Sequence, residues 1–325
     1  MRVMVTGATG FTGGHLARTL KTRGHEVRAL VRDLDQARPL AQDGIELCAG
    51  DIVDAESVQR AAAGCDVVYH IAAVYREARH PDDYYRRINV EGTRNVLDAV
   101  ERGHIGRVVH CSTVGVHGDV QKIPADENAP FAPGDVYQVT KLEGEQLARE
   151  RIDAGLPGVI FRPMGIYGPG DRRFLKLFTT IYNGTFRMIG SGDVVYQMTY
   201  VADLVDGIVL CGEHPDAVGQ TFILGGPGHT TLHEFVEIVA RVMGRKVRRG
   251  HIPVAPVMAA AVACEWLCKP FGIEPPLYPR RLDFFVKSRA FSIAKAQREL
   301  GYQPRVPLED GLRRSFEWYQ MAGWI

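Results

Sequence analysis

The sequence predicts an α/β fold, a doubly wound parallel sheet followed by a smaller carboxyl-terminal lobe. Two observations carry this prediction. Short apolar runs alternate with helix-like segments through the first half of the chain, and such alternation gives parallel strands joined by right-handed crossovers. After about Pro163, glycine and proline become denser, which indicates that the regular alternation ends there.

Six strands are predicted in the first half from short runs rich in β-branched and aliphatic residues. In chain order they cover residues 2–6, 26–31, 45–49, 67–72, 107–112 and 158–162. Helices are predicted between them where apolar residues recur at helical spacing. They cover residues 13–23, 57–63, 84–101 and 136–154. We expect these elements to form one domain over residues 1–163.

Residues 164–325 are predicted to form a smaller α/β lobe that binds the substrate. Its predicted helices cover residues 174–183, 201–212, 232–243, 292–300 and 308–321, with a short strand at 222–224. No repeat and no low-complexity linker separates the two halves. The lobe is therefore expected to pack on the first domain.

Composition excludes several classes of protein. Of 325 residues, 46% are apolar and 24% charged, which is the balance of a soluble globular protein and not of a disordered chain. The 39 basic and 38 acidic residues leave a net charge of +1, so no electrostatic signature of nucleic acid binding is present. None of the six cysteines forms a CxxC pair, which predicts free thiols in the cytoplasm and no metal site.

The longest apolar segment covers residues 252–268 and contains two prolines. It is shorter than the roughly 20 residues that a membrane-spanning helix needs. A strand pattern begins at Met1, so no signal peptide and no integral membrane segment are expected. Two interpretations of the apolar segment stay open. One is a buried or groove-lining helix, and the other is a surface that meets a lipid-like substrate or a membrane face.

A glycine-rich turn lies between the first predicted strand and the first helix. Its Gly-x-x-Gly-x-x-Gly spacing allows a tight turn and a close approach of the backbone to a pyrophosphate at a helix N-terminus. The position at the end of a first strand makes this pattern specific. The candidate cofactor-binding residues of the turn are Gly7, Thr9, Gly10, Phe11, Thr12 and Gly13.

The end of the second strand favours NADP(H) over NAD(H). Val31 stands where an acidic residue would bind the ribose hydroxyls of NAD, and Arg32 follows it. An arginine suits a 2′-phosphate, although Asp33 keeps NAD open. After the third strand, Asp51 can accept a hydrogen bond from the adenine amine, with Ile52 beside it. The alternative for Asp51 is a helix cap or a turn residue.

Tyr137 and Lys141 are four residues apart and share one helix face. A lysine ammonium beside a phenol favours the phenolate, so the tyrosine can exchange a proton with an alcohol or carbonyl. The fifth strand ends at Ser112 and Thr113, where a hydroxyl faces the ligand crevice of such folds. Thr113 is the preferred residue to orient the substrate oxygen, with Ser112 as the alternate.

Together these motifs resemble the extended short-chain dehydrogenase/reductase superfamily over essentially the whole chain. The marks are Thr6–Gly13, Gly50-Asp51, His70–Ala73, Asn89–Thr93, Ser112-Thr113, Tyr137–Lys141, Arg162-Pro163, Tyr200–Asp203 and Leu300–Pro304. The resemblance implies a Rossmann-type domain and an NAD(P)-dependent enzyme. It also implies a homodimer paired through the helices predicted at 84–101 and 136–154.

The resemblance further implies roles for individual residues. Tyr137 would be the acid and base, Lys141 would hold the nicotinamide ribose, and Thr113 would hold the substrate oxygen. Ala72 and Ala73 would line the cofactor groove, and Pro163 with the two residues after it would border the nicotinamide. Asn89 would support the active-site wall. One departure is His117, where relatives often carry tyrosine. It is expected either in the substrate pocket or packed at the surface.

Two branches of the superfamily compete for the function. Enzymes of hydrophobic ketones and sterols fit Val31-Arg32 and the apolar segment. Nucleotide-sugar epimerases and dehydratases fit the turn and the Tyr137–Lys141 pair, but Tyr196 stands where many of them carry an arginine for the diphosphate. The residues that can replace that arginine are Arg172, Arg173, Arg280, Arg281 and Arg289. A third hypothesis, a non-catalytic dinucleotide sensor, is disfavoured because Thr113, Tyr137 and Lys141 are all present.

Overall fold

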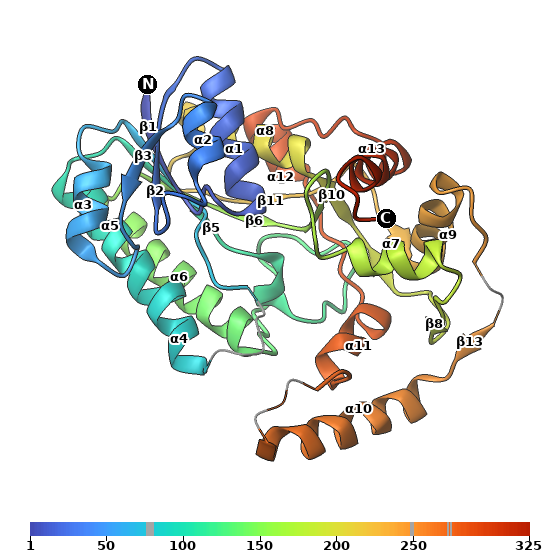
Figure 1. The fold of residues 1–325 in the computed structure, drawn as a ribbon. Helices are drawn as coiled ribbons and strands as arrows, with labels where there is room; N and C mark the ends of the chain where they lie inside the picture. The colour runs from blue at the N-terminus through green and yellow to red at the C-terminus, as the bar shows by residue number, and fades with distance from the viewer. Residues whose placement is uncertain (76–80, 248–249, 272, 274) are drawn as a thin grey trace.

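The computed structural model describes residues 1–75, 81–247, 250–271, 273 and 275–325. Its centre is a seven-stranded parallel sheet with the order β11-β6-β5-β4-β1-β2-β3 (Figure 1). The strands are β1 (Arg2–Thr6), β2 (Glu26–Val31), β3 (Glu46–Ala49), β4 (Val67–His70), β5 (Arg107–Cys111), β6 (Gly158–Pro163) and β11 (Thr221–Leu224). The predicted fold class is confirmed.

Helices cover both faces of this sheet. Successive residues of a strand point to opposite faces, and here the residues on both faces are mostly apolar. Along β1, Val3 and Val5 belong to one buried cluster, whereas Met4 between them belongs to the other. The first face carries α1 (Phe11–Thr22), α2 (Arg38–Gln42), α8 (Val201–Glu213) and α12 (Ala294–Leu300). The second carries α3 (Ala55–Ala62), α5 (Gly92–Arg102) and α6 (Val136–Asp153).

The strand β11 comes from the carboxyl-terminal half of the chain yet completes the central sheet beside β6. The helices α8 and α12 likewise pack on that sheet. The edge of the sheet therefore does not coincide with the predicted division at residue 163, and that division stays a prediction.

The predicted helix 84–101 is interrupted. It consists of α4 (Asp82–Arg86), a π-helical turn (Arg87–Glu91) and α5. A π-helical turn inserts one residue into a helix, and such turns are frequent at functional sites. Here it directs the Asn89 side chain to the backbone N–H of Val74, over 2.9 Å. Periodicity predicted the helix but not this insertion.

The rest of the carboxyl-terminal half surrounds an aromatic core. Its helices are α7 (Leu175–Tyr182), α9 (Leu232–Val242) and α13 (Leu308–Met321). Three short strand pairs tie its loops together: β7 (Gly165–Tyr167) with β10 (Met198–Tyr200), β9 (Val195–Tyr196) with β12 (Thr230–Thr231), and β8 (Met188–Ile189) with β13 (His251–Ile252). Phe178, Phe235 and Tyr319 lie at the centre of this core.

The apolar segment forms α10 (Val254–Cys268), which is connected to the body through α11 (Pro279–Val286) (Figure 1). The interpretation as a buried helix is wrong, since Ala261 alone among its residues is buried. Among the described residues, the helix contacts protein on one side only, and its other side is exposed. No helix in the described ranges is long and apolar enough to span a membrane.

Candidate active site

The glycine-rich turn connects β1 to α1 and brings two pieces of backbone into contact. Gly7 has φ +73°, and a Cβ on it would lie 2.8 Å from the N atom of Ala72. A Cβ on Gly13 would lie 2.2 Å from the carbonyl oxygen of Gly7. The helix α1 begins after Gly10 without a side-chain cap, so Thr9, Phe11 and Thr12 surround an uncapped N-terminus. An uncapped helix N-terminus suits an anion.

A chain of hydrogen bonds fixes the end of β4 beside this turn. The Thr6 hydroxyl accepts from the backbone N–H groups of Ile71 and Ala72 and lies 2.9 Å from Nδ1 of His70. On the other side, Nε2 of His70 lies 3.0 Å from the Thr93 hydroxyl, which donates to the carbonyl of Asn89. The direction of these bonds requires a neutral imidazole with its proton on Nε2. Burial lowers the pKa of His70 to about 3, with the Lys141 charge as a second cause.

The predicted residues at the second and third strands have different surroundings. Arg32 is exposed and makes no hydrogen bond or ion pair within the described residues, whereas the Asp33 carboxylate accepts from two backbone N–H groups of its own turn. The Asp51 carboxylate accepts from the N–H of Val53, as the turn interpretation expected. Ile52 is buried against Gly92.

At the end of β4, Ala72 is half-buried and Ala73 is exposed. Asn89 fixes the loop that follows them, because its side chain also donates to the Thr140 hydroxyl of α6, over 3.0 Å. The π-helical turn thus connects this loop to the helix that carries Tyr137. Sequence alone gave Asn89 a supporting place but not these partners.

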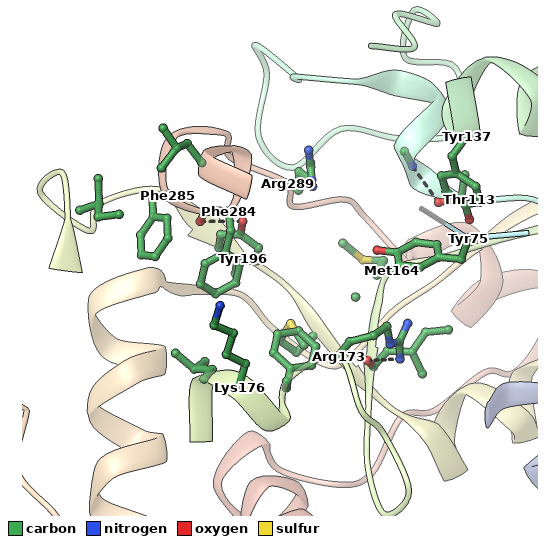
Figure 2. Close-up of a pocket in the computed structure, with 18 of the residues that line it drawn as sticks. Tyr75, Thr113, Tyr137, Met164, Arg173, Lys176, Tyr196, Phe284, Phe285 and Arg289 are labelled. Atoms are coloured by element: carbon green, nitrogen blue, oxygen red, sulfur yellow. Dashed lines mark hydrogen bonds between the residues drawn. The ribbon is translucent and has the colours of Figure 1, made fainter. Parts of the chain in front are cut away.

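Thr113 and Tyr137 line one cavity of about 960 Å³. Figure 2 shows them at one end of it, with Tyr75 and Met164 beside them. The Tyr75 and Tyr137 rings meet edge to face with centroids 4.9 Å apart. Thr113 begins a short 3-10 turn and accepts from the N–H of Gly115. Pro163 also borders the cavity.

Ser112 and Lys141 lie behind this end of the cavity. The buried Ser112 hydroxyl donates to the Glu145 carboxylate, so it is not free to hold a substrate oxygen. The Lys141 side chain is buried, and its Nζ donates to the carbonyl of Cys111 over 2.5 Å. Burial lowers the pKa of Lys141, and the neighbouring Cys111 and Glu145 oppose that shift.

A buried ion pair lies next to Ser112, and it was not predicted. Nη2 of Arg162 lies 2.5 Å from Oε1 of Glu145, and both side chains are about 5% exposed or less. Arg162 also donates to the carbonyl of Glu127 and to Nε2 of His117. The signal in the sequence was a charged residue near the end of an otherwise apolar strand, directly before Pro163.

His117 occupies neither of its two expected places. It is buried, its Nδ1 lies 3.2 Å from the carbonyl of Pro130, and it does not line the cavity. Burial and the Arg162 charge lower its pKa. Because Arg162 donates to Nε2, the ring is neutral, and its function is to complete the hydrogen bonds of that guanidinium.

The remainder of the cavity is mostly apolar and carries positive charge. Figure 2 shows Tyr196, Phe284 and Phe285 at the end away from Tyr137, with Arg289 between the two ends. Its cationic lining residues are Arg173, Lys176, Arg187 and Arg289. No carboxylate lines it within the described residues. The Tyr196 hydroxyl, in the place expected for an arginine, donates to the carbonyl of Phe284 over 2.8 Å.

The predicted cofactor turn and the cavity meet at one contact. The Arg173 guanidinium lies over the Phe11 ring, 5.3 Å from its centroid, and pairs with the buried Asp171. Among the other arginines that were considered for a diphosphate, Arg172 lies over the Trp324 ring. The side chains of Arg280 and Arg281 fall outside the described part of the structure.

No group of three metal-ligating side chains occurs in the described residues, and the six cysteines are free thiols.

A model of the "NAD dependent epimerase/dehydratase family" matches residues 3–225. Over 98% of its length the chain is 32% identical to a 3-beta-hydroxysteroid dehydrogenase of Mycolicibacterium neoaurum, of which it covers 91%. It is 33% identical to a 4-hydroxy-2-methyl-3-oxo-4-farnesyl-3,4-dihydroquinoline-1-oxide ketoreductase of Stigmatella aurantiaca, with 96% of this chain and 95% of the relative covered.

Among solved structures, the fold is similar to DesIV, a dTDP-glucose 4,6-dehydratase of Streptomyces venezuelae with NAD and TYD bound. The TM-score is 0.80 at 26% identity, and the match covers all of this chain and 98% of the other.

The buried ion pair generates a stability prediction. Glu145→Gln leaves the Arg162 guanidinium buried without a counter-charge, so the free energy of unfolding should fall by about 3–5 kcal/mol. The matched control is Glu143→Gln on the same helix, whose partner Arg86 is half exposed. The control should lose about 1 kcal/mol or less. Urea denaturation measures both, and equal losses in the two variants would contradict the prediction.

Two of the buried histidines, His70 and His110, predict acid sensitivity. His110 is buried without a hydrogen-bond partner in the described residues, and burial lowers its pKa well below the ordinary value. Below a pH of about 6.5 the unfolded chain binds a proton that folded His70 or His110 does not. Each therefore removes up to about 1.4 kcal/mol of stability per pH unit as the pH falls.

His110→Leu should accordingly reduce the loss of stability between pH 7 and pH 5, measured by urea denaturation at both values. Val109→Ala on the same strand controls for a core change that removes no titrating group. It should keep the wild-type pH dependence. The same dependence in His110→Leu as in the wild type would show that His110 is not held neutral.

Proposed function

The chain belongs to the NAD dependent epimerase/dehydratase family, within the extended short-chain dehydrogenase/reductase superfamily, and from this premise we propose a specific reaction. The protein is an NAD(P)-dependent oxidoreductase that acts on a secondary alcohol or ketone of a hydrophobic substrate, sterol-like or β-keto. The observation that carries the proposal is the large, mostly apolar cavity with Thr113 and Tyr137 together at one end.

The proposed roles follow from the positions of the side chains. Tyr137 gives a proton to the substrate oxygen during reduction, or takes it during oxidation. The buried Lys141 favours the phenolate of Tyr137 and holds the nicotinamide ribose. Thr113 donates a hydrogen bond to the same substrate oxygen, a role that Ser112 cannot take while it is bonded to Glu145.

The proposed cofactor site lies along the carboxyl ends of the strands. The turn with Gly7, Gly10 and Gly13 fits a pyrophosphate, because a Cβ at either end would clash with backbone. Asp51, Ile52, Ala72, Ala73 and Pro163 complete the groove. The bound nicotinamide dinucleotide supplies or accepts the hydride. Arg32, which is exposed and unpaired in the described residues, favours NADP(H) over NAD(H).

A nucleotide-sugar epimerase or dehydratase is the second candidate. The cationic lining of the cavity and the likeness to DesIV favour it, since a diphosphate needs positive partners. Against it, the Arg173 charge is already paired with Asp171, and Tyr196 stands in the place of an arginine. The apolar lining and the hydroxysteroid dehydrogenase and ketoreductase relatives support the first candidate.

We further propose that the protein acts in the cytoplasm as a homodimer. The pairing would involve α6 and the segment from α4 to α5, which lie next to each other on one face of the molecule.

Tyr137→Phe tests the reaction. Turnover of hydrophobic ketones, assayed with 3-ketosteroids and long-chain β-keto compounds, should fall at least about 100-fold because the proton donor is lost. The dissociation constant of NADPH should stay within about twofold. Tyr182→Phe, which does not line the cavity, is the control and should keep its activity. Turnover of a UDP-sugar by the wild type, with none of the ketones, would instead establish the second candidate.

Arg32→Ser tests the cofactor preference. Loss of a charged hydrogen bond to the 2′-phosphate should weaken NADPH binding about 10- to 100-fold and leave NADH binding nearly unchanged. Fluorescence titration with both cofactors measures this, and Arg38→Ser, an exposed arginine nearby, is the control. Retention of NAD by the purified wild type, identified by mass after denaturation, would contradict the preference.

A further inference from the structure

The solvent face of α10 consists entirely of apolar residues. Trp266 is 75% exposed, Leu267 59% and Val262 53%. The exposed residues of the helix are Ala255, Pro256, Ala259, Ala260, Val262, Ala263, Trp266 and Leu267. A surface helix normally turns charged or polar residues to water, whereas every exposed residue of α10 is apolar and its one charged residue, Glu265, is half-buried.

The apolar face continues beyond both ends of the helix. Phe271 is 77% exposed and Ile273 59%, and Ile252 before the helix is 39% exposed. Soluble proteins rarely expose contiguous apolar surface on this scale unless it meets a partner. Single exposed residues such as Val218 are ordinary, but this series is not.

The opposite side of α10 is held by the protein. The helix packs against α11, and the Val254 side chain touches the backbone of Gly190, where an added Cβ would lie 3.1 Å from it. Figure 1 shows α10 at the outer edge of the molecule, with α11 between it and the body. The body thus supports the helix from one side and leaves its apolar face outward.

The stretch of sequence that contains α10 is rich in positive charge. Residues 245–281 contain seven basic and two acidic side chains, a net charge of +5, although the whole chain carries only +1. In the sequence, the basic residues come before or after the helix, and none lies within it. They are Arg245, Lys246, Arg248, Arg249, Lys269, Arg280 and Arg281.

We propose that α10 and its basic flanks dock this protein on an anionic lipid bilayer, with the helix lying in the plane of the interface. An apolar face with Trp266 enters the acyl boundary while the flanking cations meet the headgroups. At about 1.5 Å per residue, the 15-residue helix is about 22 Å long, shorter than the hydrocarbon core of about 30 Å. It therefore lies on the membrane.

A lipid surface fits better than a protein partner for two reasons. Apart from Val262, Trp266 and Leu267, the exposed residues of the helix are alanines and a proline, which offer little side chain for the close packing of a protein interface. A bilayer needs no shape complementarity and attracts the basic flanks directly.

Docking through α10 would bring the cavity close to a substrate dissolved in the bilayer. This role for docking rests on the proposed function. The segment after α10 leads through Leu277 and Tyr278, which line the cavity, into α11, which contributes Phe284 and Phe285. A hydrophobic substrate dissolved in the bilayer would therefore meet a nearby entrance.

Vesicle sedimentation of the full chain tests the proposal. The wild type should pellet with vesicles of equal parts phosphatidylcholine and phosphatidylglycerol and stay largely in solution with phosphatidylcholine alone. The variant W266E/L267E should lose at least about tenfold in the partition coefficient. The matched control V218E/M321E puts two glutamates at exposed apolar residues elsewhere (38% and 80% exposed) and should bind as the wild type does.

Three results would overturn the proposal: no pelleting of the wild type with either vesicle, equal binding by W266E/L267E, or an oligomer that W266E/L267E dissociates without any vesicle binding. The last would make the face a protein interface. NADPH titration of each variant reports folding, since α10 lies outside the proposed cofactor groove. If the protein reduces ketones but does not bind vesicles, the docking proposal fails and the proposed function stands. If it binds vesicles but reduces no ketone, the proposed function fails and the docking proposal stands.

Discussion

The pair between Arg162 and Glu145 holds together the three elements from which the site is made. Arg162 is the second-last residue of β6, and Glu145 lies one turn after Lys141 on α6. The Ser112 hydroxyl donates to the same carboxylate and so connects the end of β5 to the pair. Two charges removed from water are stable only when their hydrogen bonds are complete. The loop carbonyl of Glu127 and the neutral ring of His117 complete them. Thr113 and Tyr137 owe their common cavity to this network.

The central sheet and most helices were predictable because their signals are local. Strands such as Arg2–Thr6 are short apolar runs, and Leu308–Met321 shows a helical period in its own residues. The glycine-rich turn and the Tyr137–Lys141 pair were predictable for the same reason. The partners of Asn89 and Glu145 come from distant parts of the chain, so no spacing in the sequence announces them. The exposure of α10 was not predictable either, because it depends on which other parts of the chain pack against the helix.

The cavity joins two kinds of chemistry. The end with Thr113 and Tyr137 is built from the regular sheet and α6, whereas its far end comes from short strands and α11 in the carboxyl-terminal half. The lining of the cavity combines aromatic with cationic side chains, so it is compatible with a hydrophobic substrate and with one that carries a diphosphate.

The contact between Phe11 and Arg173 has a kinetic consequence. The ring belongs to the turn proposed for the pyrophosphate, and the guanidinium belongs to the wall of the cavity. Two sites with a common wall are not filled independently, because the occupant of one settles the shape of the other. A dinucleotide bound at the turn would lie beside Phe11, and Phe11 contacts Arg173 in the wall against which a second molecule would rest. Such an architecture favours compulsory order, in which the nucleotide arrives first and departs last.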